Sequence, residues 1–210
     1  LEWFLRMRQA CIHPHLVDIG LGKKWGVTVP IEQNVPSTKF EVIRTMMEAH
    51  SDEKTLIFCY FKPEMDMLRN ILERGEWSAY QIDGSVSMAE RTEAIEAFRA
   101  DTDKSVMLIQ ISAGAVGMNL QFASRVYFTS PHYNPSVEIQ AIARAHRLGQ
   151  ERPVKVVKVT IVDDGFIEEE ILAKQNLKRE VMARVLDDKR LLDNAPRYRI
   201  KADDNDIQYN

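Results

Sequence analysis

Short apolar runs alternate along the chain with longer stretches in which apolar residues recur every three or four positions. The runs predict five strands, over residues 55–60, 79–83, 105–111, 125–130 and 154–162. Because the strands are apolar on both faces and alternate with helices, we expect an α/β fold with a mainly parallel sheet and helices on both of its faces. Sheets of this kind bind ligands beyond the carboxyl ends of their strands.

Local signals predict where the helices between these strands begin and end. Ser87 and Glu90 form a capping box at the start of one helix. Asn134 and Pro135 supply the N-cap and the first-turn proline of another, and Gly75 ends the helix that follows the first strand.

The flanking segments are organised differently. We expect helices over 1–12 and 166–186, and a helix capped by Thr38 and Glu41 that runs through residue 50. Residues 18–36 are rich in Gly and Pro and are expected to be irregular. The sequence has no internal repeat.

Composition limits the classes of protein that fit. The 210 residues have a net charge of −3 and 45% hydrophobic residues, which suits one globular domain of roughly 150–200 residues with a loose tail. No apolar run approaches the ~18 residues of a membrane-spanning helix, so no membrane partner is expected. Two cysteines exclude a disulfide framework and fit a reducing compartment, the cytosol or nucleus. The charge excludes general coating of nucleic acid but not a local basic groove. A start at Leu1 inside a predicted helix indicates a piece of a longer protein.

The stretch "RAHRLGQ" at 144–150 carries the strongest candidate chemistry. On a continuous helix, Gln140, Arg144 and Arg147 fall within an arc of roughly 60°. An adjoining apolar stripe then docks on the sheet; its residues are Val137, Ala141, Ala145 and Leu148. Arginine matches phosphate oxygens with fixed, forked donors, so such a pair suits a polyphosphate or a transferring phosphoryl group. The alternative is a solvated helix face with ordinary salt bridges.

Five segments resemble the Swi/Snf-type chromatin-remodelling ATPases of helicase superfamily two. "QAIARAHRLGQERPV" (140–154) is similar to their motif VI, whose His-Arg-x-Gly-Gln form differs from the usual ending in RNA helicases. "KTLIFCYF" (54–61) is similar to motif IV, and "LIQISAGAVGMNLQFASRVYFTSPHYNPSVE" (108–138) to motif V and the strand beyond it. "YQIDGSVSMAERTEAIEAF" (80–98) is similar to the segment after motif IV. "LRMRQACIHPHLV" (5–17) resembles the helix that joins the two lobes, particularly in DNA-repair members with a RING finger.

The resemblance implies a division of the chain. We expect an inter-lobe linker and helix over 1–36, a RecA-like C-terminal lobe over 37–163 and a brace helix over 164–190. Residues 191–210 have few core-forming residues and are expected to form a mobile tail.

The resemblance also implies site residues near the nucleotide. Family members close two RecA-like lobes over ATP and Mg²⁺, which the N-terminal lobe mainly binds. Arg144 and Arg147 match the arginine fingers of motif VI, and Gln140 matches the residue that helps to position them. Gly117 and Asn119 match the part of motif V that approaches the nucleotide.

Double-stranded DNA is the partner that the resemblance implies, with nucleosomes or repair factors beside it and a nuclear location. Ser85, Gln110 and Ser112 match positions that contact DNA phosphates without reading sequence. Six positions depart from the family pattern. The family has serine, lysine, glycine, aspartate and two tryptophans at Gln110, Ser112, Ala115, Ser130, His132 and Tyr133. The missing lysine removes one phosphate partner, so the departures affect DNA coupling more than ATP contact.

Three other features have plain structural interpretations beside functional ones. "GLGKK" (20–24) lacks the first glycine and the Ser or Thr of a phosphate loop, and a Gly-rich turn with solvated lysines is favoured. Cys11, His13 and His15 lack a second cluster that would complete a metal site, so no metal is expected. For His146, packing or hydrogen bonding is favoured over a titrating role.

One face of the final helix is apolar but interrupted by lysines. The apolar residues are Ile167, Ile171, Val181, Met182 and Val185. Lys174 and Lys178 either cover a core edge with their stems or belong to a brace that packs against both lobes, as the family implies.

Two functions from different classes follow from these patterns. The first is the second motor lobe of a DNA-dependent ATPase that translocates on duplex DNA in chromatin remodelling or repair. The second is a catalytically degenerate lobe that acts as a binding or assembly module. With no phosphate loop and no Asp-Glu box in the chain, we expect this lobe alone not to hydrolyse ATP.

Overall fold

A parallel sheet of five strands, in the order β2-β3-β1-β4-β5, forms the centre of the computed structural model. The structure describes residues 2–30, 37–113, 117–161 and 166–186, and side chains in the last helix as far as residue 181. The strands are β1 (Thr55–Cys59), β2 (Ser78–Ile82), β3 (Ser105–Gln110), β4 (Arg125–Phe128) and β5 (Lys155–Lys158). The predicted parallel sheet is therefore confirmed, although β5 is much shorter than the expected strand over 154–162.

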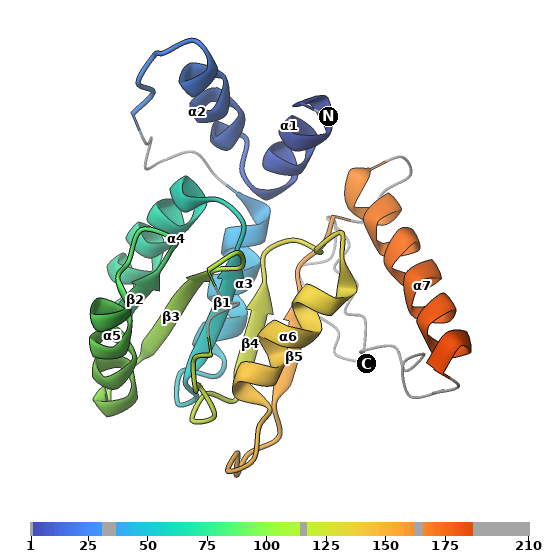
Figure 1. Cartoon of the computed structure of the whole chain (residues 1–210). Coiled ribbons are helices and arrows are strands. Elements are labelled where there is room, and N and C mark those ends of the chain that lie inside the picture. Colours follow the sequence, from blue (N-terminus) through green and yellow to red (C-terminus); the bar gives the residue numbers. More distant parts are fainter. Residues whose placement is uncertain (1, 31–36, 114–116, 162–165, 187–210) are drawn as a thin grey trace.

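Helices cover both faces of this sheet (Figure 1). They are α1 (Glu2–Ile12), α2 (His15–Lys24), α3 (Thr38–Glu48), α4 (Lys62–Arg74), α5 (Met88–Ala100), α6 (Pro135–Ala145) and α7 (Ile167–Leu186). Helices α3 and α4 pack on the face that carries Ile57 and Leu108. Helices α5 and α6 pack on the opposite face with Phe58 and Met107. Alternate residues of one strand thus enter different cores, which explains why the strands read as continuous apolar runs.

Helix α1 lies across the carboxyl ends of the strands. The Arg8 guanidinium donates to the Pro131 carbonyl, which follows β4, at 3.3 Å. It also lies 4.4 Å from the ring centroid of Tyr60, which follows β1. Figure 1 shows α1 and α2 together at the end of the sheet toward which the strands point.

Two of the predicted helix starts are confirmed and one is wrong by a residue. Ser87 and Glu90 make the reciprocal bonds of a capping box, and the Ser136 amide donates to the Asn134 side chain at 3.1 Å. The N-cap of α3 is Ser37 and not Thr38, because the Ser37 hydroxyl accepts from the Phe40 amide.

The prediction that residues 18–36 are irregular is wrong for their first part. Helix α2 continues to Lys24, so "GLGKK" is helical and forms neither a phosphate loop nor a Gly-rich turn. Its glycines allow close packing: a Cβ on Gly20 would meet Arg6 Nη1 at 1.7 Å, and one on Gly22 would meet the Val27 carbonyl oxygen at 2.7 Å. Residues 31–36 lie outside the described part.

Helix α7 stands beside the β5 edge and is joined to the lobe by buried polar contacts (Figure 1). The Lys39 ammonium on α3 lies 2.5 Å from Glu168, and both side chains are buried. Burial lowers the pKa of Lys39, although the Glu168 carboxylate opposes that shift. This ion pair fixes the first turn of α7 against α3.

The predicted apolar face of α7 is only partly buried. Ile167 and Ile171 pack with Cys11, whereas Val181 is 52% exposed. Met182 and Val185 lie outside the described side chains. Lys178 donates to the Tyr133 carbonyl and its Nζ lies 4.0 Å from the centroid of that ring, while the Lys174 Nζ lies 5.8 Å from it. The lysines thus cover Tyr133 at the edge of the lobe. The expected tail over 191–210 lies outside the described residues.

Among the described residues, no helix combines the length and apolarity that a membrane span requires.

Candidate nucleotide and nucleic-acid site

Helix α6 ends at Ala145, so Arg147 does not share the helix of Gln140 and Arg144. The backbone of His146 leaves the helical region, with φ −84° and ψ 82°. Gly149 then adopts φ +97°, a conformation that favours glycine. The predicted arc of three side chains is therefore wrong for Arg147, which projects from a turn. Leu148 is also wrongly placed by the predicted apolar stripe, because it is exposed.

The turn after α6 is held by its own glutamine. The Gln150 side-chain amide donates to the Ala123 carbonyl at 2.8 Å and to the Ala145 carbonyl at 3.4 Å. Its carbonyl oxygen accepts from the Arg152 amide at 3.0 Å. Sequence reasoning assigned no role to Gln150, although it is the last letter of the stretch "RAHRLGQ".

The candidate residues of this region differ in exposure. Arg147 is exposed, and its guanidinium makes no ion pair or hydrogen bond with the part of the chain that the structure describes. Arg144 is half-buried and Gln140 is exposed, while Ala141 and Ala145 are buried against the sheet. One side of α6 thus docks on the sheet, and the other side and the turn present cations to the surface.

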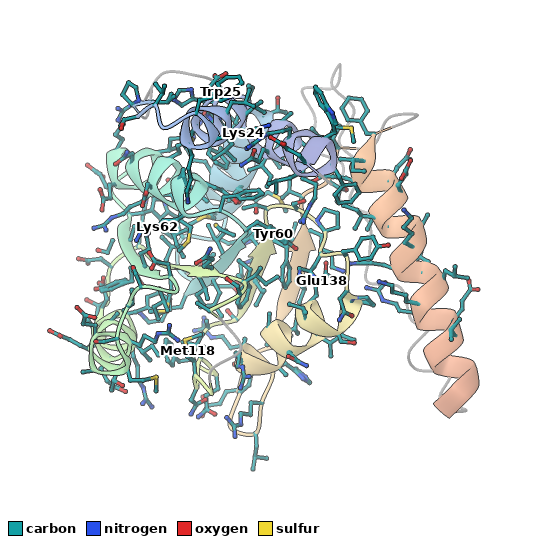
Figure 2. All side chains as sticks on the ribbon, turned by 45° about the horizontal axis from the view of Figure 1, so that its top comes forward. Lys24, Trp25, Tyr60, Lys62, Met118 and Glu138 are labelled. Carbon is teal, nitrogen blue, oxygen red and sulfur yellow. The ribbon has the colours of Figure 1, made fainter. Side chains whose placement is uncertain are left out.

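The end of motif V lies beside the end of α6. The Leu120 amide donates to the Arg144 carbonyl at 3.1 Å, which places Asn119 next to Arg144 in space. Met118 and Leu120 are buried, whereas Gly117 and Asn119 are exposed. A Cβ on Gly117 would meet no atom within 4 Å, so the glycine leaves an open surface and is not required by packing inside the lobe. Figure 2 shows Met118 near the end of α6, on the side away from α1 and α2.

The three candidate DNA contacts lie at the carboxyl ends of β2 and β3. The Gly84 amide donates to the Gln110 side-chain oxygen at 3.2 Å, which joins the segment that contains Ser85 to the end of β3. Ser112 follows two residues later and is exposed. The structure therefore brings Ser85, Gln110 and Ser112 to one edge of the sheet.

A charged network supports this edge. The Ser85 amide and hydroxyl both donate to Asp83 Oδ1, at 2.7 Å and 2.5 Å, and the Lys62 ammonium lies 2.8 Å from Asp83 Oδ2. Burial acts to raise the pKa of Asp83, but the hydrogen bonds from Lys62 and Ser85 outweigh it and lower that pKa to about 2. Asp83 is consequently a carboxylate at physiological pH. Sequence reasoning missed Lys62, which stands beyond the end of β1 and is labelled in Figure 2.

Arg91 ties this edge to motif V. Its guanidinium donates to the carbonyls of Val86 and Asp83 at 3.0 Å and 3.2 Å, and to that of Ala113 at 3.5 Å. The side chain is 9% exposed, so these carbonyls are its main partners in the described part.

The two groups of candidates therefore occupy opposite ends of one segment. Residues 111–113 leave the carboxyl end of β3, whereas Leu120 is bonded to the end of α6, and the Ser124 amide donates to the Lys54 carbonyl at the amino end of β1. Motif V thus connects the edge with Ser85 and Gln110 to the surface with Arg144 and Arg147.

Among the departures from the family pattern that the structure describes, His132 makes well-defined contacts inside the lobe. The His132 ring stacks on Tyr60 at 5.7 Å, and its backbone amide donates to buried Glu138 at 2.7 Å. Ser130 is fully buried. Ala115 lies outside the described residues.

The histidines near Cys11 make local contacts. His15 Nε2 lies 2.7 Å from the Pro30 carbonyl oxygen and its Nδ1 lies 3.3 Å from Asp18, while His13 Nδ1 accepts from the His15 amide. The described part of the chain contains no group of three His, Cys, Asp or Glu side chains that is suited to a metal ion. His146 is exposed, so it does not pack in the core, and the alternative hydrogen-bonding role stays a prediction.

Residues 38–149, more than half of the chain, match the family model described as the helicase conserved C-terminal domain. The chain belongs to this family. It is 38% identical over 65% of its length to the DNA repair protein rad8 of Schizosaccharomyces pombe. It is 30% identical over 92% of its length to the human SWI/SNF-related matrix-associated actin-dependent regulator of chromatin subfamily A member 1.

A solved structure agrees with these relatives. The C-terminal part of the Fun30 ATPase domain is similar over 74% of this chain and 52% of its own, with a TM-score of 0.63 and 26% identity. The predicted RecA-like fold and the resemblance to Swi/Snf-type C-terminal lobes are thus confirmed. The chain spans 12% of the length of rad8 and 18% of that of the human relative.

Proposed function

We propose that this chain is the second motor lobe of a DNA-dependent ATPase that translocates on double-stranded DNA. In this proposal ATP and Mg²⁺ are held mainly by an N-terminal RecA-like lobe of the same protein, and Arg144 and Arg147 complete the pocket. The observation that carries the proposal is the turn after α6. It presents exposed Arg147 close to half-buried Arg144, whose carbonyl accepts from Leu120 at the end of motif V.

The arginines act on the transferring phosphoryl group. As the bond to the leaving phosphate lengthens, negative charge spreads over the phosphoryl oxygens, and guanidinium groups at a fixed distance stabilise it. Arginine remains protonated, so it adds positive charge without a proton transfer. Gln140, one turn before Arg144 on the exposed side of α6, helps to orient the pair, and Gly117 and Asn119 face the nucleotide.

Fixed geometry is what makes such arginines effective. The Gln150 bonds to Ala123 and Ala145 join the turn to both the motif V segment and the last turn of α6. Gln150 therefore holds the backbone of Arg147 in the orientation that the proposal needs, and it is a positioning residue.

The carboxyl edge of β2 and β3 contacts one DNA strand through its phosphates. Ser112 offers an exposed hydroxyl, the Ser85 hydroxyl turns from Asp83 to a phosphate when DNA binds, and Gln110 fixes the Gly84 backbone beside it. Lys62 pairs with the Asp83 carboxylate and donates to the Ser85 hydroxyl at 3.1 Å, so it orders the Ser85 segment beside the proposed phosphate path. Phosphate contacts of this kind fix position on the duplex and are independent of base sequence.

The connection between the two sites provides the coupling. Arg91 donates to the carbonyl of Val86 and to that of Ala113, at the start of motif V. Motif V ends where the Leu120 amide donates to the Arg144 carbonyl. A shift of the segment that contains Ser85 is thereby transmitted to the end of α6. The relatives named for DNA repair and for regulation of chromatin support a nuclear location and nucleosomal or repair partners for the whole protein.

The test is ATP hydrolysis by the full-length protein with and without duplex DNA. The proposal predicts DNA-stimulated hydrolysis that Arg144→Ala and Arg147→Ala each reduce by about 10³-fold or more. Wild-type protein that DNA does not stimulate, or arginine variants with unchanged rates, would contradict it and favour a degenerate lobe that acts as a binding module. The 210-residue chain alone is expected to show no hydrolysis.

A further inference from the structure

Leu148 is the most exposed large apolar side chain in the described part of the chain, at 96%. It lies between Arg147 and Gly149 in the turn after α6. A fully exposed leucine gains nothing from its own lobe, because its side chain buries no apolar surface there.

The exposure of Leu148 is imposed by a structured turn. The His146 amide donates to the Ile142 carbonyl at 2.9 Å and the Gln150 amide to the Arg147 carbonyl at 3.0 Å. Gln150 fixes the end of the turn through its side chain, and Gly149 supplies the φ of +97° that reverses the chain. The backbone on both sides of Leu148 is thus fixed, with its side chain directed away from the core.

The exposed side of α6 continues this combination of apolar and polar groups. Ile139 is 46% exposed and Ala143, one turn later, is also exposed. Each of these two apolar residues directly precedes a polar one, Gln140 and Arg144 respectively. A purely DNA-facing surface would gain little from apolar side chains, since phosphates offer them no favourable contact.

Leu148 directly follows Arg147 in the turn, and both side chains are exposed. The Cα atoms of Arg147 and Leu148 are about 3.8 Å apart, as in any trans peptide. If the proposed function places the Arg147 guanidinium at ATP on the N-terminal lobe, Leu148 arrives at the protein surface that surrounds that nucleotide. Burial of a leucine side chain there would stabilise the closed arrangement of the lobes.

We propose that Leu148 is an apolar positioning residue that docks on the N-terminal RecA-like lobe when the lobes close and thereby holds Arg147 at the phosphoryl group. This inference rests on the proposed function and adds a lobe contact to it. Leu148 itself touches neither ATP nor DNA in this arrangement.

The experiment measures kcat and the KM for ATP of the full-length protein at saturating duplex DNA. Leu148→Ala should lower kcat about tenfold, because most of the apolar contact is removed. The KM for ATP should stay within about twofold of wild type, because the N-terminal lobe mainly binds the nucleotide. Leu148→Met, which conserves volume, should restore kcat to within about twofold of wild type.

The controls separate this role from folding and from the proposed function. Val27→Ala removes another aliphatic group that is 58% exposed, and it should leave kcat unchanged. Both alanine variants should also unfold at the same denaturant midpoint as wild type. An unchanged kcat in Leu148→Ala, a failure of Leu148→Met to rescue it, or an equal loss in Val27→Ala would overturn the inference. If Arg147→Ala is inactive in the same assay while Leu148→Ala keeps the wild-type kcat, only the inference fails; if Arg147→Ala keeps the wild-type kcat, the proposed function fails as well.

Discussion

Single residues decide where the candidate side chains can reach. His146 leaves the helical region with φ −84° and ψ 82°, which directs Arg147 and Leu148 away from the axis of α6. Gly149 with φ +97° then turns the chain. Helical spacing places both residues on α6, but the helix ends at Ala145. A glycine four residues beyond the helix end was the signal for this turn, and the apolar period that continues to Leu148 obscured it.

Gly149→Ala is expected to destabilise the turn. An L-residue at this φ is strained by about 1–2 kcal/mol, and the new Cβ would lie 3.0 Å from Gln121 Nε2. We expect a lower free energy of unfolding in chemical denaturation and a lower DNA-stimulated kcat in the full-length protein. Adding Gln121→Ala should relieve the contact but not the torsional strain, so only part of the stability should return. Full stability in Gly149→Ala would contradict the described turn.

Asp83 should make the lobe sensitive to acid. Its pKa is lowered from the usual 3.8 to about 2, so the folded state binds its proton less readily than the unfolded state. This stability is present above about pH 4 and is lost as the pH falls toward 2. In Asp83→Asn the free energy of unfolding should be lower than that of wild type at pH 6, and the difference should shrink by pH 2.5. A difference that does not change with pH would contradict the Lys62–Asp83–Ser85 network.

At the scale of elements, sequence patterns predicted the strands, which depend on local burial. They missed a helix and an ion pair that depend on contacts with other segments. The five strands follow from apolar runs because both faces of each buried strand enter a core. Helix α2 was missed because Gly20 and Gly22 are poor helix formers on their own. The absence of a Cβ at Gly20 makes room for Arg6 on α1, and at Gly22 it makes room for the Val27 carbonyl just beyond the helix. Likewise, nothing local indicated that Lys39 pairs with Glu168, which lies 129 residues away.

The ion pair between α3 and α7 gives a test of how the last helix is attached. Glu168→Ala leaves the Lys39 ammonium buried without its carboxylate, which should lower the free energy of unfolding by about 3–5 kcal/mol. The double variant Lys39→Met/Glu168→Leu removes both charges and should recover most of that loss. Denaturant titration of the 210-residue chain measures both. Equal losses in the single and double variants would contradict a buried, paired contact.

Gln150 joins the end of α6 to the motif V segment beside the candidate arginines. In Gln150→Ala the carbonyls of Ala123 and Ala145 lose a donor, and the turn that carries Arg147 is freed from the motif V segment. We expect kcat for DNA-stimulated hydrolysis to fall by about 10- to 100-fold, since misplacement by about 1 Å has effects of this size. The KM for ATP should change little. An unchanged kcat would show that the turn does not need this support.

At the scale of the whole molecule, the lobe carries two groups of candidate residues that one segment joins. The edge with Ser85, Gln110 and Ser112 and the surface with Arg144 and Arg147 lie at opposite ends of motif V. The family and the RecA-like fold could be predicted from sequence, because motif V and motif VI are each an unbroken stretch of residues that is specific to this family. The exact presentation of Arg147 could not, because it depends on how residues 120–123 pack against the end of α6.

The division of work between lobes is the central claim, and the most direct measurement compares nucleotide affinity with turnover in one variant. In full-length protein with duplex DNA, Arg147→Ala should bind a non-hydrolysable ATP analogue within about threefold of wild type while its turnover falls by about 10³-fold or more. Lysine in its place should not restore turnover, because it lacks the planar fork. A loss of analogue affinity as large as the loss of turnover, or turnover that survives the substitution, would contradict the claim that this lobe supplies its arginine to the transferring phosphoryl group.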